Sequence, residues 1–228
     1  MDDDQFDSAL IGSAMAQAET LGWRHVTVAA AAREAGLALD LARTRFPHQA
    51  SVLVRLGVLA DQAALVDDGS TGTVRERLFD MLMRRFDVLQ QYRGGVQTVM
   101  RALPFDPALV VMLAFETRTS MAWMAQASGL DTGGLAGSLR ITGLVGVWLQ
   151  TLRAWERDDS PDLSGTMAAL DRALDRAASL GRFLGGRLSP PPEITPEVPV
   201  DAVDPDGLGL EGLGPDEPFA PGPVISPG

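Results

Sequence analysis

The sequence predicts an all-α protein with a small N-terminal head of the helix-turn-helix type and a larger helical body. Apolar residues recur at helical spacing over residues 5–185, and no segment shows the strict alternation of a strand. Breaks that contain Gly or Pro divide this stretch into nine helices. Two short helices joined by a turn around Gly36 lie near the start, which is typical of a helix-turn-helix unit.

The head is predicted to span residues 1–60 and to begin with three helices. The first ends at Gly22, a residue type that favours the position after a helix. Thr27 precedes a run of alanines and fits the N-cap of the second helix, which ends at Gly36. The third covers residues 39–45 and stops before a Phe-Pro pair, because the residue before proline leaves the helical conformation. A small core against the first helix is expected from Val28, Ala31, Leu37, Leu41 and Phe46.

The body is predicted to span residues 61–185 and to be helical throughout. A fourth helix leads out of the head and ends in a polar, Gly-containing loop. Five more follow, separated by breaks rich in glycine, aspartate or proline. These six helices are expected at about 49–66, 73–92, 94–103, 107–128, 134–157 and 162–184.

The remainder, 186–228, is rich in proline, glycine and acidic residues. Such a composition buries too little apolar surface to order itself, so we expect a disordered tail. An acidic arm that binds a partner is the alternative, because a few leucines and one phenylalanine interrupt the tail.

Composition excludes several classes of function. Cys is absent and His occurs twice, so disulfides, thiolate nucleophiles and Cys- or His-rich metal sites are not expected. The sequence has no Gly-rich phosphate loop, catalytic triad or ligand cluster, so we expect neither an enzyme nor a bound metal or cofactor. The acidic start does not fit a signal peptide, and no apolar run is long enough for a transmembrane segment. These features predict a cytoplasmic protein.

The net charge of −11 argues against a protein that binds nucleic acid through its overall charge, but most of the excess negative charge lies in the tail. The tail carries eight acidic residues against one arginine, whereas residues 1–62 carry eight against five. All nineteen basic residues are arginine. The distribution of charge is therefore compatible with a head that binds DNA weakly and with strong salt dependence.

Residues 5–185 resemble the TetR family of bacterial transcriptional regulators, through specific residues in 20–60 and through the helical architecture beyond. The resemblance is carried by Gly22-Trp23, Thr27-Val28, the stretch Ala32 to Leu37, and Phe46-Pro47. It implies a ligand-responsive homodimer that represses transcription by placing two heads in successive major grooves of a double-stranded DNA operator. The helices near 134–157 and 162–184 would form the dimer interface, and a ligand in the body would change the spacing of the heads.

Candidate DNA contacts cluster around the third helix and the start of the fourth. Arginines can read guanine or hold phosphate, and small polar residues can bind the DNA backbone. At the places where the family carries a hydroxyl residue, Thr or Ala, Tyr and Lys, this chain has Ala38, Leu41, Arg43 and Gln49. A head kept for its fold, with solvated arginines, is therefore the alternative. The candidates are Arg24, His25, Thr27, Ala38, Arg43, Thr44, Arg45, His48 and Gln49.

The chain also resembles the TetR-fold accessory protein of ubiquinone biosynthesis. This resemblance rests on Ala42 to Pro47, Ser51 to Val54, Met121-Ala122-Trp123 and Asp158 to Asp162. It implies an isoprenoid- or lipid-binding protein that does not bind DNA. The last of these stretches is also a good helix start, because Asp162 can cap and Pro161 fixes the chain direction.

Methionines and aromatic residues gather in the central helices and predict a cavity for an apolar small molecule or lipid effector. Arg118, Glu116 or Gln97 would be its polar contacts. Plain core packing is the alternative. The candidate ligand-binding residues are Met81, Phe86, Met100, Phe105, Met112, Phe115, Arg118 and Trp123.

A dimer seam is predicted on the last two helices, where small residues allow a close approach and apolar residues add area. Packing within the chain is the alternative. The seam residues are Leu139, Gly143, Leu144, Gly146, Val147, Trp148, Leu152, Ala169, Ala173 and Ala177.

Overall fold

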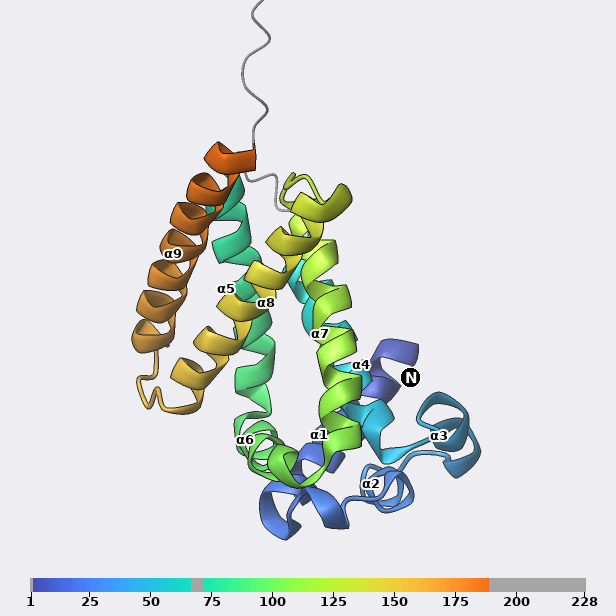
Figure 1. Ribbon diagram of the computed structural model, residues 1–228. Helices are drawn as coiled ribbons and strands as arrows, with labels where there is room; N and C mark the ends of the chain where they lie inside the picture. The colour runs from blue at the N-terminus through green and yellow to red at the C-terminus, as the bar shows by residue number, and fades with distance from the viewer. Residues whose placement is uncertain (1, 67–71, 189–228) are drawn as a thin grey trace, which may run out of the picture. The chain divides into compact units, whose positions relative to one another are not determined.

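A computed structural model describes residues 2–66 and 72–188, and this part of the chain is all-α (Figure 1). The predicted order of helices is confirmed, with two short 3₁₀ turns in addition. The predicted tail lies outside the described residues from 189 onward. The elements are α1 (Asp3–Leu21), η1 (Trp23–His25), α2 (Val28–Glu34), α3 (Leu39–Arg45), α4 (Gln49–Ala64), α5 (Val74–Gln91), α6 (Arg93–Ala102), η2 (Leu103–Phe105), α7 (Pro107–Ala127), α8 (Gly134–Glu156) and α9 (Ser164–Leu188).

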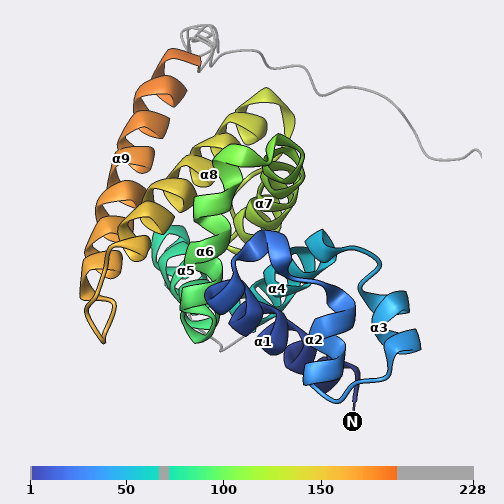
Figure 2. The ribbon, with the colours of Figure 1, turned by 90° about the horizontal axis from the view of Figure 1, so that it is seen from below.

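The head consists of α1, α2 and α3, which lie together in Figure 2. Thr27 caps α2, since its hydroxyl accepts a hydrogen bond from the Ala30 amide at 3.1 Å. Gly36 then turns the chain with φ +68°, a conformation that glycine adopts without strain. The turn is closed by the Leu37 amide, which donates to the Ala32 carbonyl at 2.8 Å. The chain is thereby aimed into α3, as the Gly36 position predicts.

The small core of the head differs from the prediction at one position. Ala31, Leu37 and Phe46 are buried as expected, and Val28 is half-buried. Leu41 was expected to join them, but its side chain is 51% exposed. Ala42 takes the inward position of α3 instead, and the register of this short helix turns Leu41 to the surface.

Helix α4 joins the head to the body without interruption. The predicted boundary at residue 60 falls inside this helix, and the division into a head and a body stays a prediction. Helices α1 and α6 cross closely, because Gly95 brings the α6 backbone against Met15. A Cβ added at Gly95 would lie 2.6 Å from the Met15 carbonyl oxygen. The head therefore packs on the body at two places.

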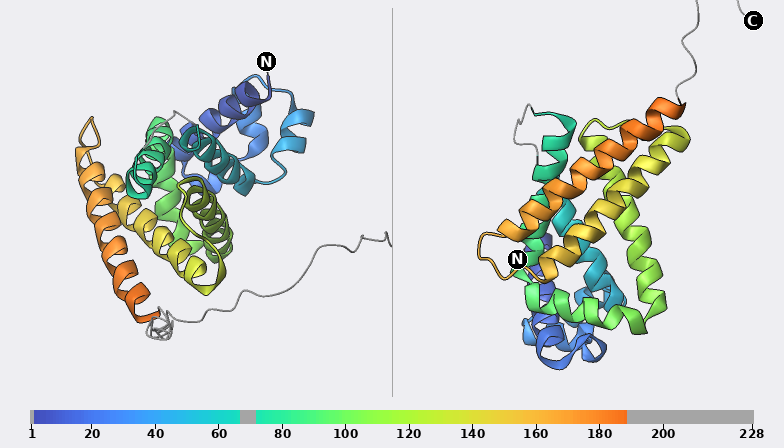
Figure 3. Two further views of the ribbon diagram at one scale, coloured as in Figure 1. Left: turned by 90° about the horizontal axis from the view of Figure 1, so that it is seen from above. Right: turned by 60° about the vertical axis from the view of Figure 1, so that its left-hand side comes forward.

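Helices α8 and α9 pack side by side, as Figures 1 and 3 show from different directions. Trp148 of α8 stacks on Phe86 of α5, with ring centroids 4.6 Å apart. Such an arrangement adds to the hydrophobic gain from burying both rings.

In the described part of the chain, no helix has both the length and the apolar character needed to cross a membrane.

Candidate nucleic-acid interface and ligand cavity

The exposed surface of α3 presents a mixed set of side chains. Arg43 and Thr44 are exposed, and the side chain of each donates a hydrogen bond to a backbone carbonyl of α3 or of the residues just after it. Arg43 donates from Nη1 to the Pro47 carbonyl at 3.1 Å, and Thr44 donates to the Asp40 carbonyl at 2.9 Å. Asp40 is exposed in the first turn. The helix therefore offers one cation and one hydroxyl, beside a carboxylate that DNA phosphates would repel.

Two exposed leucines complete the same surface and were not predicted as part of it. Leu39 is 42% and Leu41 is 51% exposed. Apolar side chains on a helix that enters the major groove can contact the methyl group of thymine. The departure of Leu41 from the family pattern was the available signal in the sequence.

Arg45 holds α3 onto α1. Its Nε and Nη2 donate to the two carboxylate oxygens of Asp7 at 2.7 and 2.9 Å, and its Nη1 lies 2.8 Å from an Asp3 carboxylate oxygen. These hydrogen bonds raise the pKa of Arg45 above its usual value, with Asp7 the larger contributor. Arg55 of α4 also faces Asp7, at 3.4 Å. Since Asp7 is only 3% exposed, this cluster fixes the placement of α3 rather than leaving Arg45 for a DNA phosphate.

The other predicted DNA contacts fall into three groups. Arg24 donates to the Phe105 carbonyl at 3.4 Å and lies 5.6 Å above its ring, so it packs against η2. Gln49 donates its side-chain amide to the Trp23 carbonyl, and Thr27 caps α2. The third group consists of the exposed candidates that make none of these contacts, namely His25, Ala38, Arg43, Thr44 and His48.

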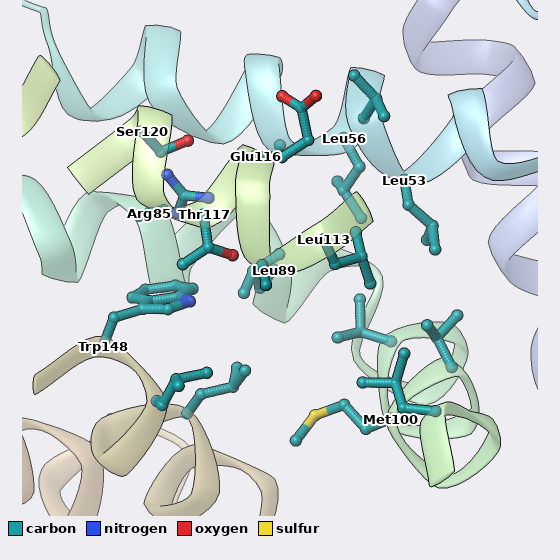
Figure 4. Close-up of a pocket in the computed structure, with 18 of the residues that line it drawn as sticks. Leu53, Leu56, Arg85, Leu89, Met100, Leu113, Glu116, Thr117, Ser120 and Trp148 are labelled. Carbon is teal, nitrogen blue, oxygen red and sulfur yellow. The ribbon is translucent and has the colours of Figure 1, made fainter. Parts of the chain in front are cut away.

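A cavity of about 320 Å³ lies among α4, α5, α6, α7 and α8. Helix α4 forms one wall, through Leu53, Leu56 and Gly57. Figure 4 shows Arg85, Ser120 and Trp148 toward one end of the cavity, with Leu53 and Met100 toward the other. This volume is near the lower limit for small-molecule sites, and the mainly apolar lining is typical of them.

The polar end of the cavity is built on a buried ion pair. The Nη1 atom of Arg85 on α5 donates to Asp61 on α4, and the hydroxyl of Ser120 on α7 donates to the other oxygen of Asp61. The guanidinium of Arg85 lies 4.7 Å above the ring of Trp148. Burial raises the pKa of the Asp61 carboxyl and lowers the pKa of Arg85. Arginine stays protonated despite such a shift, and its charge opposes the effect of burial on the pKa of Asp61.

Most of the predicted ligand-binding residues lie elsewhere than in this cavity. Met100 lines it, and so does Glu116, one of the three predicted polar contacts. Met81 and Phe86 are buried in the core, and Met112 is half-buried. The prediction placed exposed residues inside, because helical spacing alone does not show which face of a helix is buried. Those exposed residues are Phe105, Phe115, Arg118 and Trp123.

Sequence reasoning missed Asp61, Arg85 and Ser120. The signal for them was weak, because Arg85 stands beside Arg84 in a helix with several charges, and nothing marks one arginine as buried. Gln97, the remaining predicted polar contact, donates to the Glu156 carbonyl at 2.9 Å and so links α6 to the end of α8.

Exposed apolar and small residues occur on both α7 and α8. Arg118 of α7 donates to Ser138 and Thr142 of α8 at 2.9 and 3.1 Å, which ties the two helices together. The predicted seam is divided by the structure: Leu144, Trp148 and Ala173 are buried within the chain. We call the exposed set the α7–α8 face, and it consists of Val111, Phe115, Trp123, Leu135, Leu139, Gly143 and Gly146.

The acidic turn before α9 is a capping structure. One carboxylate oxygen of Asp158 accepts hydrogen bonds from the amide and the hydroxyl of Thr166, at 2.6 and 2.7 Å, and the other accepts from Ser160. These hydrogen bonds, led by that of the Ser160 side chain, lower the pKa of Asp158 to about 2. Asp162 accepts from the Ser164 amide at 3.2 Å. The Asp158 to Asp162 stretch therefore caps the start of α9 in this structure.

Comparison with solved structures identifies the fold. The structure resembles a TetR transcriptional regulator from Nitrosomonas europaea ATCC 19718, with a TM-score of 0.62 and 21% sequence identity over 77% of this chain and 99% of that one. A tetR-family transcriptional regulator from Streptomyces coelicolor is similar at a TM-score of 0.49 and 18% identity, over 82% of this chain and 90% of the other. No family model matches the sequence, and no curated protein matches it. The chain has the TetR fold, as its sequence predicts.

Proposed function

We propose that the protein is a dimeric, DNA-binding transcriptional regulator of the TetR type, a repressor that releases its operator when an apolar effector enters the cavity. The observation that supports this most directly is the course of α4. This helix begins directly after α3 and the exposed His48, and its middle forms a wall of the cavity. One rigid element therefore joins the surface that would bind DNA to the site that would bind an effector.

The proposed mechanism is a shift between two arrangements of the heads. An effector that fits the cavity better in one arrangement stabilises it by the difference between its two affinities. If that arrangement places the α3 helices at the wrong spacing for successive major grooves, operator affinity falls by the same factor. The buried Asp61–Arg85 pair links α4 to α5 at the cavity, so a ligand there acts on the helix that carries the head.

Arg43 is the residue on which we test DNA binding. Its guanidinium is exposed and, unlike that of Arg45, does not neutralise a buried carboxylate. Arg43→Ala is expected to weaken binding to a duplex from the protein's own promoter and to reduce the slope of log K against log salt by about 1. Fluorescence anisotropy over a series of salt concentrations measures both quantities.

Arg101→Ala is the matched control, because Arg101 is an exposed arginine at the end of α6 in the body. It should leave the slope unchanged. Absence of binding to promoter duplex even at low salt would contradict the regulator proposal.

A lipid-binding accessory protein on the same fold is the second candidate. It is favoured by the surface of α3, where Leu39, Asp40 and Leu41 are exposed and the nearby Arg45 is held by Asp7. Mass spectrometry of an organic extract of the purified protein would show a co-purified isoprenoid. That result, together with no DNA binding at low salt, would favour the second candidate.

A further inference from the structure

Arg85 and Ser120 lie at one end of the cavity (Figure 4), and Arg85 has one unmet hydrogen-bonding requirement. Arg85 is 6% exposed, and its Nη1 is taken by Asp61. Its Nε is buried and has no hydrogen-bond partner within the described residues. A buried donor without an acceptor is costly, and a ligand that supplies the acceptor recovers that cost. The ligand of this cavity should therefore carry a hydrogen-bond acceptor at the Arg85 end.

The charges around Arg85 select against an ionic ligand. Asp61 already balances the guanidinium, and Glu116 adds a second carboxylate to the cavity wall. An anionic head group would add uncompensated negative charge to a site of low dielectric. A cationic head group would offer no acceptor to the Nε–H. A neutral acceptor satisfies the donor without disturbing the ion pair.

Apart from Glu116 and Thr117, the rest of the cavity wall is apolar. Leu89, Val99, Met100 and Leu152 come from α5, α6 and α8, and they face Leu53 and Leu56 of α4. Burial of a hydrocarbon chain against such side chains supplies most of the binding free energy, about 0.8 kcal/mol per methylene. The ligand is therefore mainly hydrocarbon, with its acceptor at one end.

We propose that the cavity binds a neutral, mainly hydrocarbon molecule with one carbonyl-type acceptor, such as an ester or a ketone, that accepts a hydrogen bond from the Nε of Arg85. The inference rests on the effector role proposed for the cavity and gives that effector a chemical class. It assigns Arg85 as the residue that recognises the head group, with Asp61 holding the guanidinium in place.

Four probes with chains of equal length test the head-group preference on the full-length protein. They are methyl decanoate, decane, decanoic acid and decylamine, each measured by displacement of a neutral fluorescent dye. Methyl decanoate should bind about ten- to a hundredfold more tightly than decane, the range for a hydrogen bond to a charged group. Equal binding of decane, or tighter binding of the acid or the amine, would overturn the proposal.

The double variant Arg85→Met with Asp61→Asn tests the assigned residues. It removes the donor together with its counter-charge, so that no buried charge is left alone. Decane should still bind, and the preference for the ester should vanish. Arg118→Met is the matched control, because it removes an exposed arginine outside the cavity lining, and it should keep the preference. A preserved preference in the double variant would show that Arg85 is not the recognising group.

A third variant tests whether the probes occupy this cavity at all. Gly57 lies in the cavity wall, and a Cβ added there meets nothing within 4 Å. Gly57→Leu should therefore place a side chain in the cavity and weaken binding of every probe, while thermal melting reports that the protein is folded. Unchanged binding would place the ligand elsewhere. Because none of these assays contains DNA, failure here is distinguishable from failure of the regulator proposal, which the promoter titration tests alone.

Discussion

At the scale of single residues, the buried arginine of the body and the arginines of the head have different surroundings. Arg85 is enclosed by α4, α5 and α8 and is neutralised by Asp61, whereas Arg43 faces solvent. Residue type therefore does not predict role in a chain whose basic residues are all arginine. The role of an arginine depends instead on whether a carboxylate inside the protein pairs with it, as Asp7 does with Arg45 and Asp61 with Arg85.

The Asp61–Arg85 pair should show strong energetic coupling. Arg85→Met leaves Asp61, whose side chain is 21% exposed, as a partly buried charge without its partner, so it should lower the free energy of unfolding by up to about 3–5 kcal/mol. Adding Asp61→Asn should restore the stability to within about 1 kcal/mol of the wild type, or raise it. Urea denaturation of the two single variants and the double variant measures the coupling. Additive losses in the double variant would show that the two side chains act independently.

At the scale of elements, the crossing of α1 and α6 depends on one of two neighbouring glycines. A Cβ at Gly95 would meet the Met15 backbone, which cannot move without separating the helices, at 2.6 Å. A Cβ at Gly94 would meet only the carboxylate of Glu19, an exposed side chain that can swing away. The same substitution should therefore have opposite effects at adjacent positions.

Gly95→Ala is expected to lower stability by about 1–3 kcal/mol, the usual cost of overpacking. Gly94→Ala should be neutral or raise stability by up to about 1 kcal/mol, because alanine is the better helix former. Thermal or urea unfolding of both variants checks the difference. If Gly95→Ala is as stable as Gly94→Ala, the two helices are not held at this distance.

The start of α9 should depend on pH through Asp158. Its pKa is lowered from the usual 3.8 to about 2, so its stabilising effect is present above about pH 4 and is lost as the pH falls through the folded value. Asp158→Asn should lower the melting temperature at neutral pH, and the difference from the wild type should shrink in acid. Asp159→Asn is the control, because Asp159 is fully exposed and lies 3.9 Å from Arg93, and it should have little effect. A difference that persists in acid would exclude the carboxylate as the source.

The sequence was sufficient to predict the elements but not the faces that they bury. Helix order follows from local signals such as the cap at Thr27 and the turn at Gly36, which act within a few residues. Whether Leu41 or Phe115 points inward depends on the neighbours of the helix, and local spacing does not contain that information. The Asp61–Arg85–Ser120 contact joins three helices, with 24 residues separating Asp61 from Arg85 and 59 separating Asp61 from Ser120. No motif marks such a contact in a single sequence.

At the scale of the whole molecule, the α7–α8 face is where we expect a second copy to bind. It combines large exposed apolar residues with two glycines that permit close approach of another helix. Large exposed apolar patches on soluble proteins mark interaction sites. This expectation keeps α8 of the dimer interface that the resemblance implies, but puts α7 in the place of α9.

Gly143→Arg should convert a dimer into a monomer. A Cβ at Gly143 meets nothing within 4 Å, so the arginine should not disturb the fold of one chain, while its charge and length should block a partner. Sedimentation velocity measures the change, and circular dichroism should show unchanged helicity. Ala29→Arg, on the exposed side of α2, is the control and should leave the sedimentation coefficient alone. A Gly143→Arg protein that remains dimeric would place the interface on another face.

The close crossing of α1 with α6 has a consequence for protein engineering. The head cannot be transferred to another protein by cutting the chain after residue 60, because Met15 would lose the Gly95 backbone that it packs against. The cut would also divide α4 within its last turn. A working chimaera has to carry the Gly94-Gly95 segment along with the head, so the unit of exchange is discontinuous in the chain.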